Sequence, residues 1–179
     1  MKLFEAIKRL NHWDKQGRYV FRKGDLAYVF DEQGRTLDQT LVRLTKNDVL
    51  QRVAHGVYLF AFSQRIGSAT LEHIARNLRR GDYTFESLES ALSQYGVISQ
   101  IPVDRITLMT TGRSGEYHTP YGVIEFTHTK AKAEDIVANV IEREGHPLPI
   151  ASKQYAYTNL RSVGRNLTMV DTEELDGRT

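Results

Sequence analysis

The chain has 179 residues, 40% of them hydrophobic, which is enough for one medium domain or two small ones with an ordinary core. It contains no cysteine, which excludes a disulfide framework, a thiolate metal site and a cysteine nucleophile. The net charge is only +2, but residues 1–62 hold 11 Lys and Arg against 7 Asp and Glu, which indicates an anionic partner for the first third alone.

The first sixty residues predict three helices followed by a β-hairpin. Leu3, Ile7 and Leu10 recur at helical spacing and begin a helix of about ten residues. Residues 21–31 predict a second, short helix, interrupted by the turn-forming "EQG". No apolar run along the chain reaches the roughly 18 to 20 residues that would span a bilayer. The opening "MKLFEAIKRLNHW" lacks the apolar segment of a signal peptide, so we expect a cytoplasmic protein without a membrane partner.

The third helix lies in "RTLDQTLVRLTK", where Leu37, Leu41 and Leu44 form one apolar stripe. Thr36 with Gln39 three residues later is compatible with a capping box that begins this helix. The segment "VLQRVAHGVYLFAF" then predicts a hairpin that turns at a Gly. Three helices and a hairpin follow one another in the order of a winged helix-turn-helix, with the hairpin as the wing.

The face of the third helix opposite its apolar stripe is polar and basic, with Val42 as its one apolar residue. We expect Gln39 and Arg43 to reach base edges of double-stranded DNA, since Gln pairs with adenine and Arg with guanine in the major groove. Phosphate contacts are expected from the rest of this face and from the wing. The candidate DNA-binding residues are Arg35, Thr36, Gln39, Arg43, Lys46, Arg52 and His55. The alternative interpretation is a helix face that is only solvated.

A polar, Gly-containing segment, "SQRIGSA", predicts a domain boundary, with a DNA-binding domain at residues 1–62 and a mixed α/β domain at 63–179. The fold class is therefore α+β. The second domain is expected to contain a helix in "LEHIARNLRR", a helix from Phe85 that ends at Gly96, and a helix over 132–144. A last helical piece precedes an acidic tail, which is expected to be frayed.

Two strands, 103–111 and 121–128, are expected to pair through the turn-rich "GRSGEYHTP". The Gly-rich start of that segment fits a hairpin turn with Gly at strained φ better than a phosphate-binding loop, because it lacks the P-loop pattern.

No constellation of catalytic or metal-binding residues stands out, so we expect a protein that is not an enzyme and has no cofactor. The six histidines are not spaced as metal ligands, and no metal site is predicted. Glu86 and Glu89 are interpreted as a solvated pair on one helix face. A metal-dependent nuclease of the common type has an acidic residue spaced one residue before its Lys, whereas Lys130 lies five residues after Glu125, so that spacing fails.

Two blocks resemble the bacterial winged-helix family that includes the AbiE-type antitoxins of type IV toxin-antitoxin systems. One is "RTLDQTLVRLTKNDVLQRVAHGVYLF", and the other is "YTFESLESALSQYGVIS" followed by "ITLMTTGRSGEYHTPYGVIEFTHTK". The resemblance implies a repressor that binds the promoter of its own operon. It also implies an antitoxin that counteracts a nucleotidyltransferase-like toxin without forming a tight complex with it.

Two other functions stay open at this point. The chain could be a winged-helix regulator whose second domain senses a ligand or dimerises, with no toxin partner. It could also be a nucleic-acid-modifying enzyme that uses the winged helix for targeting, although the missing metal-ligand pattern argues against this. The identity of the neighbouring gene would separate the first two functions.

Overall fold

The computed structural model describes residues 1–100 and 103–177, and the chain is mixed α+β. It forms two compact units, Met1–Leu78 and Arg79–Thr179, so the division lies further along the chain than the predicted boundary at residue 63. The reason is helix α4 (Thr70–Leu78), which packs on the strands of the first unit. The Tyr19 hydroxyl lies 3.0 Å from Oγ1 of Thr70, and its ring packs edge-on against that of His73.

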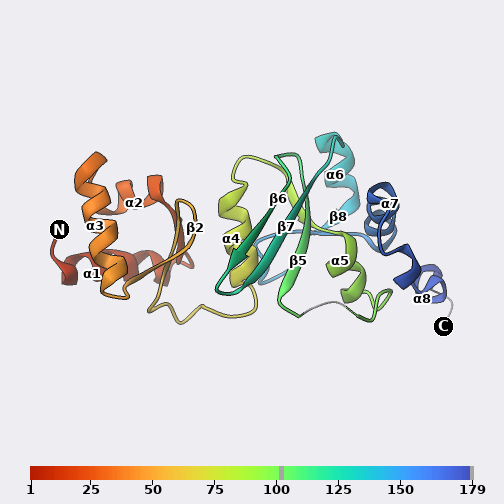
Figure 1. Ribbon diagram of the computed structural model, residues 1–179, viewed down its shortest axis with the longest axis horizontal. Coiled ribbons are helices and arrows are strands. Elements are labelled where there is room, and N and C mark those ends of the chain that lie inside the picture. Colours follow the sequence, from red (N-terminus) through yellow and green to blue (C-terminus); the bar gives the residue numbers. More distant parts are fainter. Residues whose placement is uncertain (101–102, 178–179) are drawn as a thin grey trace. The chain divides into compact units, whose positions relative to one another are not determined.

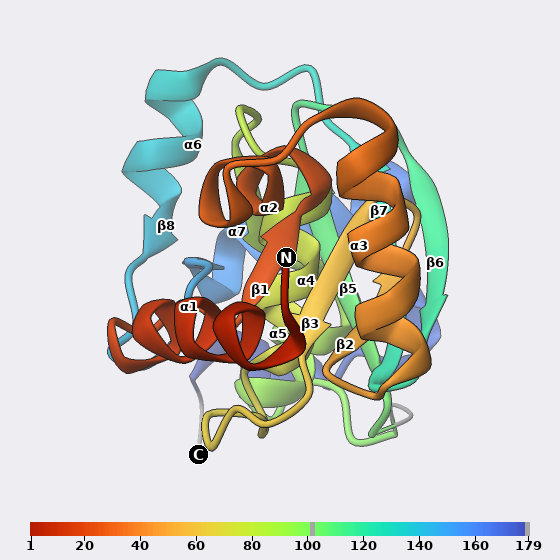
Figure 2. The same cartoon turned by 90° about the vertical axis from the view of Figure 1, so that its left-hand side faces the viewer.

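The first unit contains helices α1, α2 and α3, the helix α4 at its end and a three-stranded antiparallel sheet with the order β1-β3-β2 (Figure 1). The view turned by 90° shows α1, α2 and α3 in front of the strands of this sheet (Figure 2). The predicted helices and the hairpin are confirmed, and Gly56 supplies the left-handed backbone at the hairpin turn, with φ of 69°. Besides α4, its elements are α1 (Leu3–Lys15), β1 (Val20–Arg22), α2 (Lys23–Phe30), α3 (Gly34–Lys46), β2 (Leu50–Ala54) and β3 (Val57–Phe60).

Two details of the first unit differ from the sequence predictions. Strand β1 was not predicted, because three residues are too few to show an alternating pattern, and its partner β3 lies far along the chain. The predicted capping box at Thr36 and Gln39 is wrong, since α3 begins one turn earlier at Gly34. A comparable contact begins α2 instead, where the backbone N–H of Arg22 donates to the carboxylate of Asp25 at 2.7 Å.

The second unit is built on a six-stranded mixed sheet with the order β6-β7-β5-β4-β9-β8. Helices α5 and α7 pack against each other (Figure 1). They contribute to a core that includes Phe85, Leu92, Met109 and Leu160. Its elements are β4 (Thr84–Glu86), α5 (Leu88–Gln94), β5 (Arg105–Thr110), β6 (Gly115–Thr119), β7 (Gly122–His128), α6 (Ala133–Asn139), β8 (Val140–Ile141), β9 (Ile150–Ala151), α7 (Lys153–Val163), the 3-10 helix η1 (Leu167–Met169) and α8 (Thr172–Asp176).

The strands β5 and β7 pair as expected, but they run parallel. The segment predicted as their turn contains β6, which pairs antiparallel with β7 and lies at the edge of the sheet. The predicted helix over 132–144 ends at Asn139, where β8 begins. The helix predicted from Phe85 begins only at Leu88, because Phe85 lies in β4 opposite Met109.

Two further corrections concern the tail and a glycine. The tail is not frayed up to residue 177, because Asp171 accepts from the backbone N–H of Glu173 and Glu174 and begins α8, with Leu175 buried. Gly112 has no left-handed φ, so backbone conformation does not require glycine at this position. A Cβ there would lie 2.5 Å from Oδ2 of Asp82 and 3.1 Å from Cδ of Arg79, so glycine is favoured because it leaves space for these side chains.

Within residues 1–100 and 103–177, no helix is long and apolar enough to cross a membrane.

Candidate nucleic-acid interface

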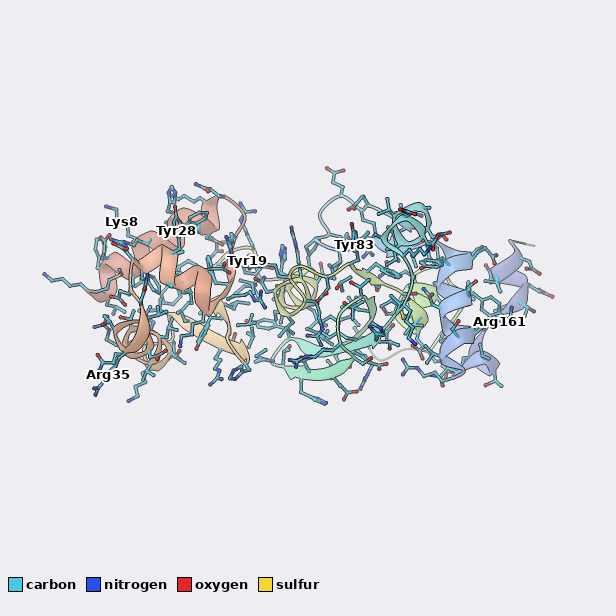
Figure 3. The ribbon with its side chains drawn as sticks, turned by 90° about the horizontal axis from the view of Figure 1, so that it is seen from above. Lys8, Tyr19, Tyr28, Arg35, Tyr83 and Arg161 are labelled. Carbon is cyan, nitrogen blue, oxygen red and sulfur yellow. The ribbon has the colours of Figure 1, made fainter. Side chains whose placement is uncertain are left out.

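Helix α3 separates its apolar and polar residues onto opposite faces. Leu37 and Leu41 are each 3% exposed and Leu44 is fully buried, so the apolar stripe supplies part of the core of the first unit. The opposite face is open to solvent, and Arg35 projects outward from it (Figure 3). All five helix residues predicted to contact DNA lie on this exposed face: Arg35, Thr36, Gln39, Arg43 and Lys46.

A shallow hollow runs along the exposed face of α3, and we call it the α3 hollow. Four of the five predicted helix residues line it, whereas Thr36 does not. Asp38 also lines it and was missed by the sequence analysis, although its position three residues after Arg35 places it on the same helical face. The residues lining the α3 hollow are Arg35, Asp38, Gln39, Val42, Arg43, Lys46 and Asn47.

Two of the side chains that line the α3 hollow already have partners within the protein. The carboxylate of Asp38 forms an ion pair with Nζ of Lys23 at 2.5 Å, which offsets the one negative charge in the hollow. The guanidinium of Arg43 donates through Nη2 to the carbonyl oxygen of Met1, so part of its hydrogen-bonding capacity is already used. Among the described residues, the side chains of Arg35, Gln39 and Lys46 have no hydrogen-bond or ion-pair partner, and they are available to a ligand.

The hairpin of β2 and β3 carries the other two predicted residues, and both are exposed. Nη2 of Arg52 lies 3.1 Å from Nδ1 of His55. A guanidinium can only donate, so Nδ1 accepts this bond and the ring holds its proton on Nε2. The contact fixes the Arg52 side chain beside the turn and brings these two predicted residues together.

The second unit contains a chain of ion pairs, from the buried Glu89 to the exposed Glu116, that sequence reasoning missed. The carboxylate of Glu125 accepts from Arg105 at 3.1 Å and from Arg165 at 2.5 Å. Arg165 also binds Glu89, and Arg105 also binds Glu116. A cavity of about 340 Å³ lies beside these groups, lined by Glu89, Gln100, Arg105, Thr107, Glu125, Arg165, Asn166 and Met169.

The interpretation of Glu86 and Glu89 as a solvated pair is wrong, because their side chains are buried. Leu88 between them has φ of 58°, a left-handed backbone that is rare for a bulky residue. Glu86 binds Arg143 at 2.8 Å, whereas Glu89 binds Arg165 at 2.6 Å. Each carboxylate is therefore held by its own guanidinium. The described residues contain no group of three or more His, Asp or Glu side chains placed to hold a metal ion.

Comparison with known proteins identifies a matching family and a solved structure with a similar fold. A family model described as a family of unknown function (DUF6088) matches residues 6–143. The search of curated proteins finds no match. The crystal structure of the RV2827C protein from Mycobacterium tuberculosis has a similar fold, with a TM-score of 0.58 and 16% sequence identity over 87% of this chain. The match spans 59% of the Mycobacterium protein, so a large part of that protein has no counterpart here.

Proposed function

The chain belongs to the DUF6088 family, whose function is unknown, and we propose that this member is a DNA-binding transcriptional repressor with an N-terminal winged helix-turn-helix. The observation that carries the proposal is the exposed face of α3, where cationic and amide side chains line one hollow. We infer that α3 enters the major groove and that the hairpin of β2 and β3 acts as the wing.

The dimensions of α3 agree with this docking. From Arg35 to Lys46 the helix extends about 16 Å, which spans the edges of about four or five stacked base pairs. Gln39 and the remaining donors of Arg43 would contact base edges near the middle of this length. Arg35, Thr36 and Lys46 would hold phosphates, and Arg52 and His55 would do so from the wing.

We further propose that the protein is the antitoxin of an AbiE-like toxin-antitoxin system and acts in the cytoplasm. The support is the resemblance of "YTFESLESALSQYGVIS" and the following hairpin to that antitoxin family. In this proposal the protein binds the promoter of its own operon, and its second unit counteracts a nucleotidyltransferase-like toxin without a tight complex. We propose that it acts as a binding protein without a cofactor and not as an enzyme, in keeping with the pairing of the buried Glu86 and Glu89 carboxylates with Arg143 and Arg165.

A binding titration tests the repressor proposal. Purified full-length protein is titrated onto a duplex of the promoter upstream of its own gene and onto a shuffled duplex of the same composition, at several salt concentrations. We expect tighter binding to the promoter, with affinity that falls as salt rises because cationic side chains displace condensed counterions. Equal, weak binding to both duplexes would contradict the proposal.

Growth measurements test the antitoxin proposal separately. Expression of the neighbouring toxin gene should arrest growth, and full-length protein should restore it. A variant with Arg35, Gln39 and Lys46 all replaced by Ala should lose promoter binding but still restore growth, if the second unit counteracts the toxin. Continued arrest with folded wild-type protein would contradict the antitoxin role and leave repression standing.

The cavity in the second unit favours the alternative regulator that senses a ligand and has no toxin partner. Its volume of about 340 Å³ and its lining of Arg and Glu side chains suit a small charged molecule. Growth that is unaffected by the neighbouring gene, together with specific promoter binding, would favour this alternative.

A further inference from the structure

Val42 lies in the middle of the polar face of α3. Its side chain is 56% exposed, whereas the adjacent Leu41 is 3% exposed in the core. Arg35, Gln39, Val42 and Lys46 follow one another at intervals of four, three and four residues, which places them along one line of the helix surface. Val42 is therefore on the line that would point most directly into a groove, and not at its edge.

The neighbours of Val42 are groups that can read base edges. Gln39 lies one turn before it, Lys46 one turn after it and Arg43 beside it, all on the wall of the α3 hollow. Each of these side chains can hydrogen-bond to a base or a phosphate, whereas valine has no donor or acceptor. The one apolar group that the standard base pairs present in the major groove is the 5-methyl group of thymine.

Resting on the proposed DNA-binding function, we propose that Val42 is a specificity-determining residue that packs on the 5-methyl group of a thymine. The contact would remove apolar surface of both groups from water. At a cytosine or guanine the same side chain would cover an amino group or a carbonyl and deprive it of water, which is unfavourable. The protein should therefore select an A·T pair at the base pair facing the middle of α3.

The surroundings of Val42 favour DNA over a protein partner. Apolar surfaces that bind other proteins are usually contiguous over several hundred Å². In the α3 hollow a single valine is enclosed by arginine, lysine and glutamine side chains, and its one acidic neighbour is already paired with Lys23. This pattern suits a polyanion that carries one methyl group among many polar ones.

The test begins with a selection of duplexes from a random pool of about 20 base pairs by the full-length protein. Each thymine of the enriched sequence is then replaced by uracil, which removes the methyl group and keeps the hydrogen-bonding edge. For wild type we expect one thymine whose replacement weakens binding about fourfold, the effect of taking one methyl group out of an apolar contact. The Val42→Ala protein should bind the thymine and uracil forms of that position almost equally.

A matched control shows whether the loss of the uracil effect is specific to Val42 or follows from replacing any exposed valine. Val137 in α6 of the second unit is also exposed, at 61%. The Val137→Ala protein should keep the full uracil effect at the same position. Val42→Thr should keep part of it, because threonine retains one of the two methyl groups. Since Val42 is exposed on a helix, alanine at this position should leave the fold intact.

The outcomes distinguish the two levels of the proposal. If a sequence is enriched but no position responds differently in wild type and Val42→Ala, the thymine contact is refuted and DNA binding stands. If the wild type enriches no sequence and binds all duplexes weakly, the proposed function itself fails, and the thymine contact with it. If Val42→Ala instead changes the sedimentation of the free protein, Val42 contacts another copy of the chain, which also overturns the inference.

Discussion

Arg165 and Glu89 form a two-point ion pair, although 76 positions separate them in the sequence. Nε of Arg165 donates to Oε1 of Glu89 at 2.6 Å, and Nη2 donates to Oε2 at 3.0 Å. Asn166 adds a third bond to the same carboxylate at 2.9 Å. The pair ties the segment after α7 to α5, and it lies beside the cavity of the second unit.

Replacement of Glu89 by Gln should destabilise the second unit by about 1–3 kcal/mol, because a buried acceptor of charged hydrogen bonds is lost. The side chain of Glu89 is 8% exposed but that of Arg165 is 37% exposed, so solvent reduces the cost below that of a fully buried pair. Amide hydrogen exchange in α5 and α7 measures the change. Glu116→Gln is the control at the exposed end of the ion-pair chain, and an equal effect there would contradict the prediction.

The same pair predicts a pH dependence of stability. Burial would raise the pKa of Glu89, but the hydrogen bonds from Arg165 and Asn166 outweigh it, and the pKa lies below its ordinary value. The stabilisation is therefore complete above the unfolded-state pKa of about 4.3 and is lost as the pH falls through the lower folded-state pKa. Urea unfolding followed by circular dichroism should show a smaller loss of stability below pH 5 in Glu89→Gln than in wild type. An equal loss of stability below pH 5 in the two proteins would refute the prediction.

Single substitutions on α3 should divide by role. Arg43→Ala should weaken promoter binding by about 1–3 kcal/mol and relax the preference at one base pair, since the donors not bound to Met1 remain for a base. Lys46→Ala should weaken binding to all duplexes alike and reduce the salt slope by about one unit. Lys130→Ala, an exposed lysine of the second unit, is the control. If all three folded variants bind DNA like the wild type, the exposed face of α3 is only solvated and does not contact DNA.

Leu41→Ala should destabilise the first unit by about 2–5 kcal/mol, because it opens a cavity in a small core. Trp13 is the single tryptophan of the chain and lies in α1, so its fluorescence during urea unfolding reports on this unit. Val42→Ala on the exposed face is the matched control and should change stability by less than about 0.5 kcal/mol. Equal effects of the two substitutions would contradict the assignment of the buried face.

Gly112→Ala should destabilise the second unit by about 1–2 kcal/mol, the typical cost of overpacking. The new methyl group would press on Asp82 and on Arg79, which is itself packed over the ring of Phe126. Gly24→Ala is the control, because it lies in α2 with no atom within 4 Å of the added Cβ. It should be neutral or stabilising, since alanine favours the helix. Thermal unfolding of both variants measures the difference. If Gly112→Ala does not lower the stability, the side chains of Asp82 and Arg79 move aside without cost and the prediction is wrong.

The sequence by itself determined the elements whose pattern is complete within one segment. The stripe of Leu37, Leu41 and Leu44 identified α3 and its exposed face, because helical periodicity is a property of consecutive residues. The hairpin at His55-Gly56 was predicted for the same reason, since its strands are joined by a short turn that requires glycine. The candidate DNA-binding residues followed from these two local patterns.

Only the tertiary structure decided which distant segments meet. The three residues of β1 become a strand because β3 supplies their hydrogen-bond partners, and β5 runs parallel to β7 because β6 reverses the chain between them. Glu89 was expected at the surface but is buried, and its partner Arg165 follows it by 76 positions in the sequence. Pairings of this kind depend on loop closure over tens of residues, so the pattern of side chains within one segment does not predict them.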